Sequence, residues 1–233
     1  MTILILAAHP DDEVLGCGGT IPNLKKQGEE VHIVILGQGI TSREKNASAD
    51  ASKKIKSLQS NATSAAKIMG ADSIQFHSFP DNRFDSVPML DIIKTIEDHI
   101  LHFKPHTIFT HHPGDLNIDH TITGRATLTA ARPVPGQGVK NIYAYEVLSS
   151  TEWTFSCVSP PFEPNLFMDI QDNISIKVEA MKAYTSEIRK FPHPRSSDAI
   201  ITLAKQRGSM AGLPYCEAFS IIRAIKGITN EKK

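Results

Sequence analysis

The chain has 233 residues, with 25 basic and 25 acidic side chains and a formal net charge of zero. A balanced charge gives no support to binding of nucleic acid or an anionic membrane, and no apolar run reaches the roughly 18 residues of a transmembrane helix. The three cysteines, Cys17, Cys157 and Cys216, are widely spaced, so neither a disulfide framework nor a zinc knuckle is expected. The cytoplasm is the expected compartment.

Short apolar runs alternate with helical stretches along most of the chain. The runs that end at a turn or a polar cluster predict buried strands at residues 3–8, 30–36, 73–76, 107–110 and 141–146. Apolar residues at helical spacing predict helices over residues 15–27, 52–69 and 88–103. This alternation predicts a single α/β domain over residues 1–233, with a doubly wound, mostly parallel sheet.

The C-terminal part, from about residue 174, is predicted to be mainly helical and to pack on the same domain. Helices are expected at residues 174–184, 198–211 and 216–225, with prolines marking the loops between them.

The first strand ends in a charged segment, His9-Pro10-Asp11-Asp12-Glu13. The three carboxylates at this spacing repel one another, and burial beside an imidazole removes their solvation, so the segment calls for a cation. An imidazole and a carboxylate at positions i and i+3 can bind one ion, with a spare carboxylate beside it. The segment therefore predicts a metal-hydrolase site, while Glu13 is expected mainly to favour the start of the next helix.

A second polar cluster follows the fourth predicted strand, with three histidines and two carboxylates in residues 111–120. Loops at the carboxyl ends of parallel strands share one crevice, so this cluster is expected to face the first. One of its histidines would complete a three-ligand zinc site with His9 and Asp12. Asp11 would then accept a proton from water. Asp119 would orient an imidazole, or only favour a helix N-terminus.

Both segments resemble signatures of the zinc-dependent LmbE/PIG-L deacetylases. Residues 9–13 with Gly16 and Gly18-Gly19 are similar to the first signature, and residues 117–120 to the second. Residues 177–186, His193 and residues 207–219 resemble the C-terminal motifs. The resemblance implies a Rossmann-like three-layer sandwich and hydrolysis of N-acetyl groups on amino sugars or sugar conjugates.

The same resemblance implies roles for particular residues. His9, Asp12 and His120 would bind zinc, although iron or cobalt would also suit two nitrogens and one oxygen. Asp11 would be the general base. His193 would contact the substrate or the oxyanion from a loop. Asn117 stands where many relatives have histidine, and it could support the oxyanion as a neutral donor.

Three substrate contacts are also expected, each beside a simpler alternative. Arg43 occupies the position of a basic, substrate-facing residue in the family, or is a solvated loop arginine. Asp81 could bind sugar hydroxyls or belong to a plain turn. His112 could line the pocket or bond to the backbone of its loop.

The predicted function is zinc-dependent removal of an acetyl group from an N-acetylated amino sugar or sugar conjugate. Hydrolysis of a non-acetyl or thiol-conjugate amide is an alternative activity. A sugar-binding protein with weakened catalysis is the alternative of another class, and Asn117 is the residue that keeps it open. The sequence is compatible with a homo-oligomer.

Overall fold

A seven-stranded sheet in the order β3-β2-β1-β4-β5-β7-β6 organises the fold. The computed structural model describes residues 1–40 and 49–227. The strands are β1 (Thr2–Ala7), β2 (Glu30–Gly37), β3 (Ser73–Phe79), β4 (Thr107–His111), β5 (Asn141–Tyr145), β6 (Leu166–Asp169) and β7 (Cys216–Ala224). Strands β1 to β5 are parallel, whereas β7 runs antiparallel to both of its neighbours, β5 and β6.

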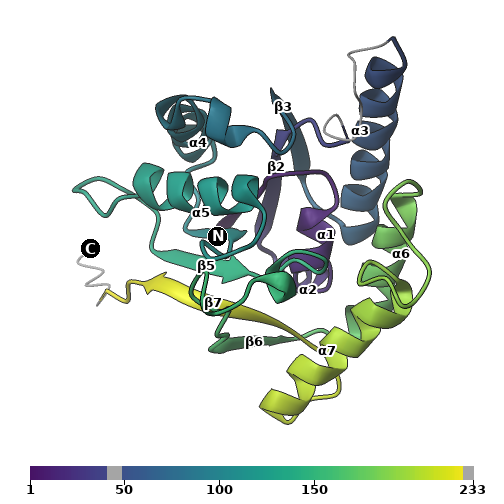
Figure 1. Cartoon of the computed structure of the whole chain (residues 1–233). Helices are drawn as coiled ribbons and strands as arrows, with labels where there is room; N and C mark the ends of the chain where they lie inside the picture. The colour runs from purple at the N-terminus through teal and green to yellow at the C-terminus, as the bar shows by residue number, and fades with distance from the viewer. Residues whose placement is uncertain (41–48, 228–233) are drawn as a thin grey trace.

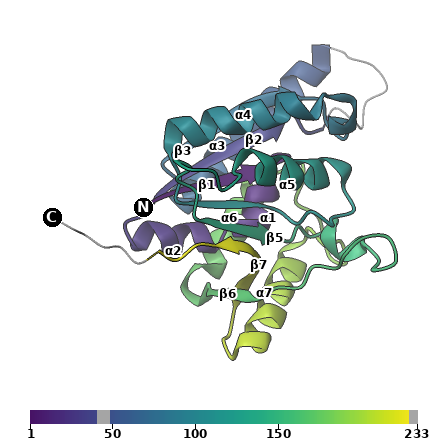
Figure 2. The ribbon, with the colours of Figure 1, turned by 90° about the vertical axis from the view of Figure 1, so that its left-hand side faces the viewer.

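Helices cover both faces of this sheet, which gives three layers (Figures 1 and 2). They are α1 (Asp12–Cys17), α2 (Thr20–Lys26), α3 (Ala49–Met69), α4 (Met89–Phe103), α5 (Ile118–Ala130), α6 (Ile174–Ala183) and α7 (Ser197–Ala211). Helices α4 and α5 pack together on one face, and α3 and α6 pack together on the other. No helix among the described residues is both long and apolar enough to cross a membrane.

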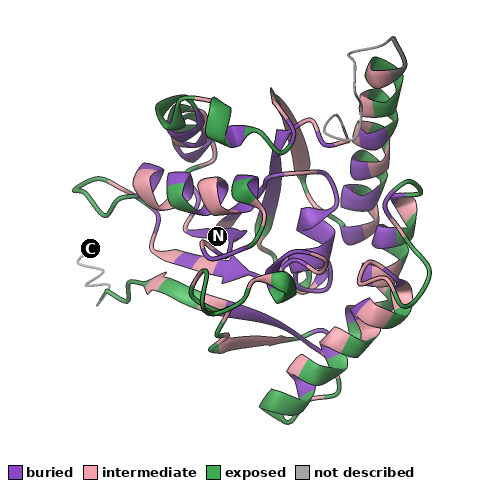
Figure 3. Cartoon of the chain, viewed as in Figure 1, coloured by how far each residue is buried: buried purple, intermediate pink, exposed green. Residues whose placement is uncertain are grey.

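The centre of the sheet is buried on both sides (Figure 3). Ile3, Ile5 and Ala7 of β1 join the core beneath α1, α3 and α6, whereas Leu4 and Leu6 join the core beneath α4 and α5. Successive side chains of a strand point to opposite faces, so a strand covered on both sides is apolar at every position. The prediction of a three-layer α/β fold with a mostly parallel sheet is confirmed.

The C-terminal prediction was wrong for residues 216–225, which form strand β7 and not a helix. The first four residues of β7 are all buried; they pair with β6, and Phe219 pairs with β5 as well. The strand therefore lacks the alternation of polar and apolar residues that marks a half-buried strand. The adjacent β-branched residues Ile221 and Ile222 favour a strand. Of the helices expected after residue 174, α6 and α7 are present.

The single helix predicted after the first motif is instead two short helices, α1 and α2, which separate at Gly18 and Gly19. Glycine is required nearby for close packing, since a Cβ at Gly16 would lie 2.3 Å from the ring of Tyr145. The carboxylate of Glu217 accepts hydrogen bonds from the backbone N–H of Gly19 and of the following residue. A buried side chain from β7 thereby satisfies the free N–H groups at the start of α2.

Strands β1 and β4 lie side by side where the strand order reverses. The chain passes outward from β1 through β2 to β3, and then returns to the other side of β1 as β4. Loops diverge at such a point and leave a crevice at the carboxyl ends of the strands. The two polar segments singled out in the sequence follow β1 and β4 directly, so the fold brings them to this crevice.

Candidate functional site

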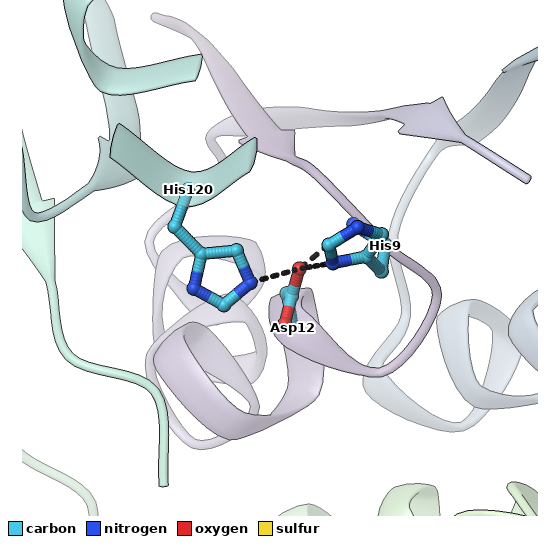
Figure 4. A group of neighbouring side chains, drawn as sticks. All are labelled: His9, Asp12 and His120. Atoms are coloured by element: carbon cyan, nitrogen blue, oxygen red, sulfur yellow. Dashed lines mark hydrogen bonds and ion pairs between the residues drawn. The ribbon is translucent and has the colours of Figure 1, made fainter. Parts of the chain in front are cut away.

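The side chains of His9, Asp12 and His120 converge at the carboxyl ends of β1 and β4 (Figure 4). Oδ2 of Asp12 lies 3.5 Å from Nδ1 of His9 and 3.3 Å from Nε2 of His120. Donors about 2.0–2.2 Å from a tetrahedral zinc ion are separated from one another by roughly 3.3–3.6 Å. These two distances therefore fit donors of one ion, and the three donor atoms all lie within 4.8 Å of one another.

A carboxylate lies against the outer nitrogen of each imidazole. Nε2 of His9 is 2.9 Å from Oδ2 of Asp119, and Nδ1 of His120 is 3.2 Å from Oδ1 of Asp115. An outer carboxylate holds the ring and keeps the proton on the outer nitrogen, so the inner nitrogen has its lone pair free for a metal. His9 therefore has the hydrogen-bonded arrangement that metal-binding histidines usually have, whereas the contact of His120 with Asp115 is an ion-pair contact without hydrogen-bond geometry.

The pKa values show that the site attracts positive charge. Burial alone would lower the pKa of His9, but Asp119 and Asp12 outweigh it and raise the pKa to about 10. Burial likewise opposes the charge on His120, yet Asp12 and Asp115 raise its pKa to about 9. A divalent cation would supply this positive charge and displace the protons from the inner nitrogens. The donor set therefore fits a divalent metal.

His111 supports the cluster from β4. Its Nε2 accepts a hydrogen bond of 2.9 Å from the backbone N–H of Ala8, and its ring stacks on that of His120 with centroids 4.0 Å apart. Burial lowers the pKa of His111 well below its usual value, which agrees with a neutral ring that accepts at Nε2. His111 therefore fixes the end of β1 against the ring of His120.

The backbone of Asp11 is held in an uncommon conformation at the start of α1, with φ of 104°. Its N–H donates to Oε2 of Glu13 over 3.1 Å, and Oε1 of Glu13 accepts a 2.5 Å hydrogen bond from the hydroxyl of Tyr184. Positive φ in a residue other than glycine costs about 1–3 kcal/mol and persists only where surrounding contacts impose it. Glu13 and Tyr184 supply such contacts. The carboxylate of Glu13 is therefore used to hold the backbone of Asp11, and it does not belong to the candidate metal group.

The side chain of Asp11 is buried, with 1% of the residue exposed. Its Oδ2 lies 2.9 Å from Nη1 of Arg195. Burial raises the pKa of Asp11, Arg195 lowers it and the charge of Asp12 raises it further, to about 7. A carboxylate with a pKa near neutrality is suited to accept and return a proton.

A pocket of about 70 Å³ opens beside His9 and Asp11. It is lined by His9, Pro10, Asp11, Gly39, Ile40, Leu58, Asp81, Asn82, Asn117, Glu187 and Arg195. Pockets for whole drug-sized ligands measure roughly 300–1,000 Å³, whereas one water molecule occupies about 30 Å³ in the liquid. The pocket therefore has room for a small group of a substrate and not for an entire sugar.

A larger cavity of about 560 Å³ lies at the opposite edge of the sheet, between the C-terminal ends of α4 and α5. Leu101, Lys104 and Val134 are among its lining residues. The described residues contain two groups of possible metal ligands, which are His9 with Asp12 and His120, and His9 with Asp81 and Asp119; neither group lies there. The smaller pocket is therefore distinguished by the candidate metal ligand that lines it and not by its volume.

Two other residues singled out in the sequence line the small pocket. Asp81 is buried, and its Oδ1 lies 3.4 Å from Nε2 of His9. Asn117 is the N-cap of α5: its Oδ1 accepts from the N–H of Asp119, and its Nδ2 donates to Oδ1 of Asn82. The structure thus brings Asp81 and Asn117 close to the candidate metal ligands, and the side-chain amide of Asn117 is partly used in capping α5.

The remaining sequence candidates lie elsewhere. His112 does not line the pocket, because its Nε2 donates to the carbonyl oxygen of Pro160 over 3.0 Å. His193 is partly exposed, and its Nδ1 accepts from the backbone N–H of Arg195, so it adjoins a pocket residue without lining the pocket itself. Arg43 lies outside the described residues.

Three residues near the site had been given no role from the sequence. Asp115 belongs to the second cluster, and a carboxylate five positions before His120 was the available signal; hydroxyls of Ser150 and Thr151 also donate to it. Arg195 follows His193 closely, which was a weaker signal. Glu187, which pairs with Arg195, had none, because the contact depends on the tertiary fold.

Comparison with known proteins agrees with this geometry. The family described as PIG-L: GlcNAc-PI de-N-acetylase matches residues 4–131. A 1D-myo-inositol 2-acetamido-2-deoxy-alpha-D-glucopyranoside deacetylase of Mycobacterium sp. (strain JLS) is 25% identical over 235 residues, covering 83% of this chain and 76% of the relative. The diacetylchitobiose deacetylase of Thermococcus kodakarensis is 24% identical over 230 residues, covering 97% and 84%.

Among solved structures, N,N'-diacetylchitobiose deacetylase from Pyrococcus horikoshii superposes with a TM-score of 0.77 at 21% identity, covering 98% of this chain and 87% of that one. At this identity the likeness supports the fold. The family match spans both polar segments, which follow β1 and β4. The chain therefore belongs to the PIG-L family, whose description is GlcNAc-PI de-N-acetylase.

Proposed function

We propose that this protein is a zinc-dependent hydrolase that removes the acetyl group from an N-acetylated amino sugar or sugar conjugate. The observation that carries the proposal is the convergence of His9, Asp12 and His120 beside the buried carboxylate of Asp11, at a pocket sized for a small group. The family match and the names of the deacetylase relatives support the same activity.

Nδ1 of His9, Oδ2 of Asp12 and Nε2 of His120 would hold the metal. Two imidazoles and one carboxylate form a common donor set of catalytic zinc, which keeps a fourth position open. A divalent ion held there would polarise the acetyl carbonyl and make a water molecule more acidic.

Asp11 acts as the general base. Its carboxylate takes one proton from the attacking water, whose oxygen forms a bond to the carbonyl carbon. When the carbon–nitrogen bond breaks, the same carboxyl group returns the proton to the leaving nitrogen. The products are acetate and the free amine. The pKa of Asp11, about 7, suits both transfers near neutral pH.

His193 and Asn117 are the two candidates for a donor to the oxyanion. Nδ1 of His193 accepts from a backbone N–H, so the proton of the neutral ring lies on Nε2. Burial and the charges of Arg195 and Arg189 lower the pKa of His193, which favours this neutral donor. Nδ2 of Asn117 uses one N–H on Asn82 and has a second to offer.

Substrate contacts are proposed on the same pocket. Asp81 at its wall would accept a hydrogen bond from a sugar hydroxyl. Arg43, which follows β2 in the chain, would also contact the substrate. His112 would act only indirectly, by holding the loop at Pro160.

The test combines elemental analysis of the purified protein with an acetate-release screen over N-acetyl amino sugars in free, nucleotide-linked and lipid-linked form. We expect about one zinc ion per chain, acetate release from at least one class, loss with a chelator and recovery with zinc. Recovery only with iron or cobalt would correct the metal. Release of another acid from a non-acetyl amide would favour the alternative amidase. Sugar binding with no hydrolysis by the metal-loaded protein would favour a binding protein.

A further inference from the structure

The carboxylate of Asp11 has a guanidinium group beside it that the proposed chemistry has not used. Nη1 of Arg195 lies 2.9 Å from Oδ2 of Asp11, and both residues line the small pocket. A buried carboxylate is costly without a compensating charge. Arg195 supplies this charge at the atom nearest to the proposed proton transfer.

Arg195 is itself fixed by two further contacts. Its Nη1 donates to Oε2 of Glu187 over 2.9 Å, and its Nε donates to the hydroxyl of Ser149 over 2.9 Å. Glu187 is buried, and the side chain of Arg195 is 19% exposed. Three contacts from different segments leave the guanidinium little freedom, so the group is preorganised before a substrate enters.

The orientation of the guanidinium has a specific effect on Asp11. Nη1 meets hydrogen-bond geometry with Glu187, whereas Oδ2 of Asp11 accepts no hydrogen bond from any described residue. The contact with Asp11 is therefore an attraction between charges that leaves the lone pairs of Oδ2 available. A hydrogen bond directed at that oxygen would compete with the proton that a general base must accept.

We propose that Arg195, held by Glu187 and Ser149, is a positioning residue for the deacetylation, which holds the Asp11 carboxylate by charge and leaves Oδ2 free to accept a proton. This inference rests on the proposed function, because it assigns Arg195 a role through the base. A displacement of about 1 Å at a reacting group can lower turnover by 10²-fold, so loss of this contact would act on kcat.

A second arginine offers a matched control for a purely structural ion pair. Arg207 on α7 binds Glu146 through Nε and Nη2, and its side chain is 16% exposed, against 19% for Arg195. Arg207 does not line the small pocket. The two arginines therefore have similar burial and a similar glutamate partner, and differ in the contact with Asp11.

The experiment compares Arg195→Ala, Arg195→Lys and Arg207→Ala in the metal-loaded full chain. For Arg195→Ala we expect kcat to fall by about 10²-fold, with KM changed less than about threefold and metal content unchanged. Arg195→Lys should recover part of kcat. Guanidinium at a non-denaturing concentration should restore turnover to Arg195→Ala, which a merely structural role would not allow. Arg207→Ala should keep the wild-type kcat.

Wild-type kcat in Arg195→Ala would overturn the proposal. A loss confined to KM, a loss accompanied by loss of metal, or an equal loss in Arg207→Ala would also overturn it. If the wild-type protein releases no acetate, the proposed function fails separately. Crystal structures of the wild type and Arg195→Ala then decide this inference, since an unmoved Asp11 carboxylate would refute it.

Discussion

Two parts of the chain meet at the pocket, and they contribute different things. The segments that follow β1 and β4 provide the candidate metal donors: His9 lies in the turn after β1, Asp12 begins α1 and His120 lies in the first turn of α5. The segment that follows α6 provides Tyr184, Glu187 and Arg195, whose described contacts lead to Asp11 and to Glu13 beside it. The candidate metal donors and the contacts to the proposed base therefore come from separate regions, which can be changed separately.

The largest expected effect comes from removing a donor in the first region. His120→Ala should lose most of its bound metal and reduce acetate release to the background, because two remaining donors hold a divalent ion weakly. Elemental analysis of the variant gives the metal content. His102→Ala, which alters an exposed histidine on α4, is the matched control. Full metal content in His120→Ala would remove His120 from the donor set.

The next largest effect should appear at the residue where the two regions meet. Asp11→Asn keeps the shape of the side chain but removes the base, so turnover should fall by about 10²- to 10⁴-fold while metal stays bound. Steady-state kinetics and elemental analysis on the same preparation measure both quantities. Loss of metal in this variant would contradict the separation of the two regions.

The outer carboxylates of the first region should have an intermediate effect. Asp119→Asn and Asp115→Asn should each weaken metal affinity by about 10- to 100-fold without abolishing binding, because the imidazole loses its orienting partner. Competition with a chelator measures the affinity. Asp119 also accepts from the N–H groups of Asn82 and Phe84, and Asp115 accepts from the hydroxyls of Ser150 and Thr151, so both variants should unfold at a lower temperature than the wild type. Wild-type metal affinity in both variants would exclude an orienting role.

A smaller effect is expected at His193 in the second region. His193→Ala should lower kcat by roughly tenfold with metal unchanged, which is less than the 10²- to 10³-fold that a fixed oxyanion donor supplies. The reason is that the side chain is partly exposed and does not line the pocket. Kinetics with a saturating substrate test this, and unchanged kcat would leave Asn117 as the candidate donor.

The smallest expected effect is a pH dependence of the stability of the fold, which arises from a pair of histidines away from the pocket. Nε2 of His77 on β3 lies 2.6 Å from Nε2 of His99 on α4, and burial, with His77 adding to it, lowers the pKa of His99 to about 4. Between about pH 6.5 and 4 the unfolded chain binds more protons than the native one, so stability is full above that range and falls on acidification. The denaturant midpoint of the wild type should therefore fall between pH 7 and pH 5 by more than the midpoint of His99→Leu does, so the difference between the two proteins should change with pH. An equal difference at both values would exclude this linkage.

The first region could be predicted from the sequence because its signals are local. His9 and Asp12 lie within four residues of each other directly after an apolar run, and His120 lies in the polar segment that follows the next inner strand. Parallel strands then bring their carboxyl ends together. The assigned roles of Asp11, Asn117 and His193 stay predictions, which the variants above test.

The second region could not be predicted in the same way. Arg195 reaches Asp11 only because the chain returns to the pocket after α6, and no spacing in the sequence encodes that distance. Strand β7 was also misassigned, because burial on both faces removes the alternation by which a strand is recognised. Interactions between distant segments decided both features.

The positive φ of Asp11 implies that thermal stability and the proposed activity favour different residues at this position. Glycine adopts this conformation without steric cost, so a chain selected for resistance to heat alone would have glycine at this position. The natural chain keeps an aspartate there and accepts a strained turn at the pocket. Efforts to make the protein more heat-stable should therefore leave this turn unchanged and begin at sites remote from it.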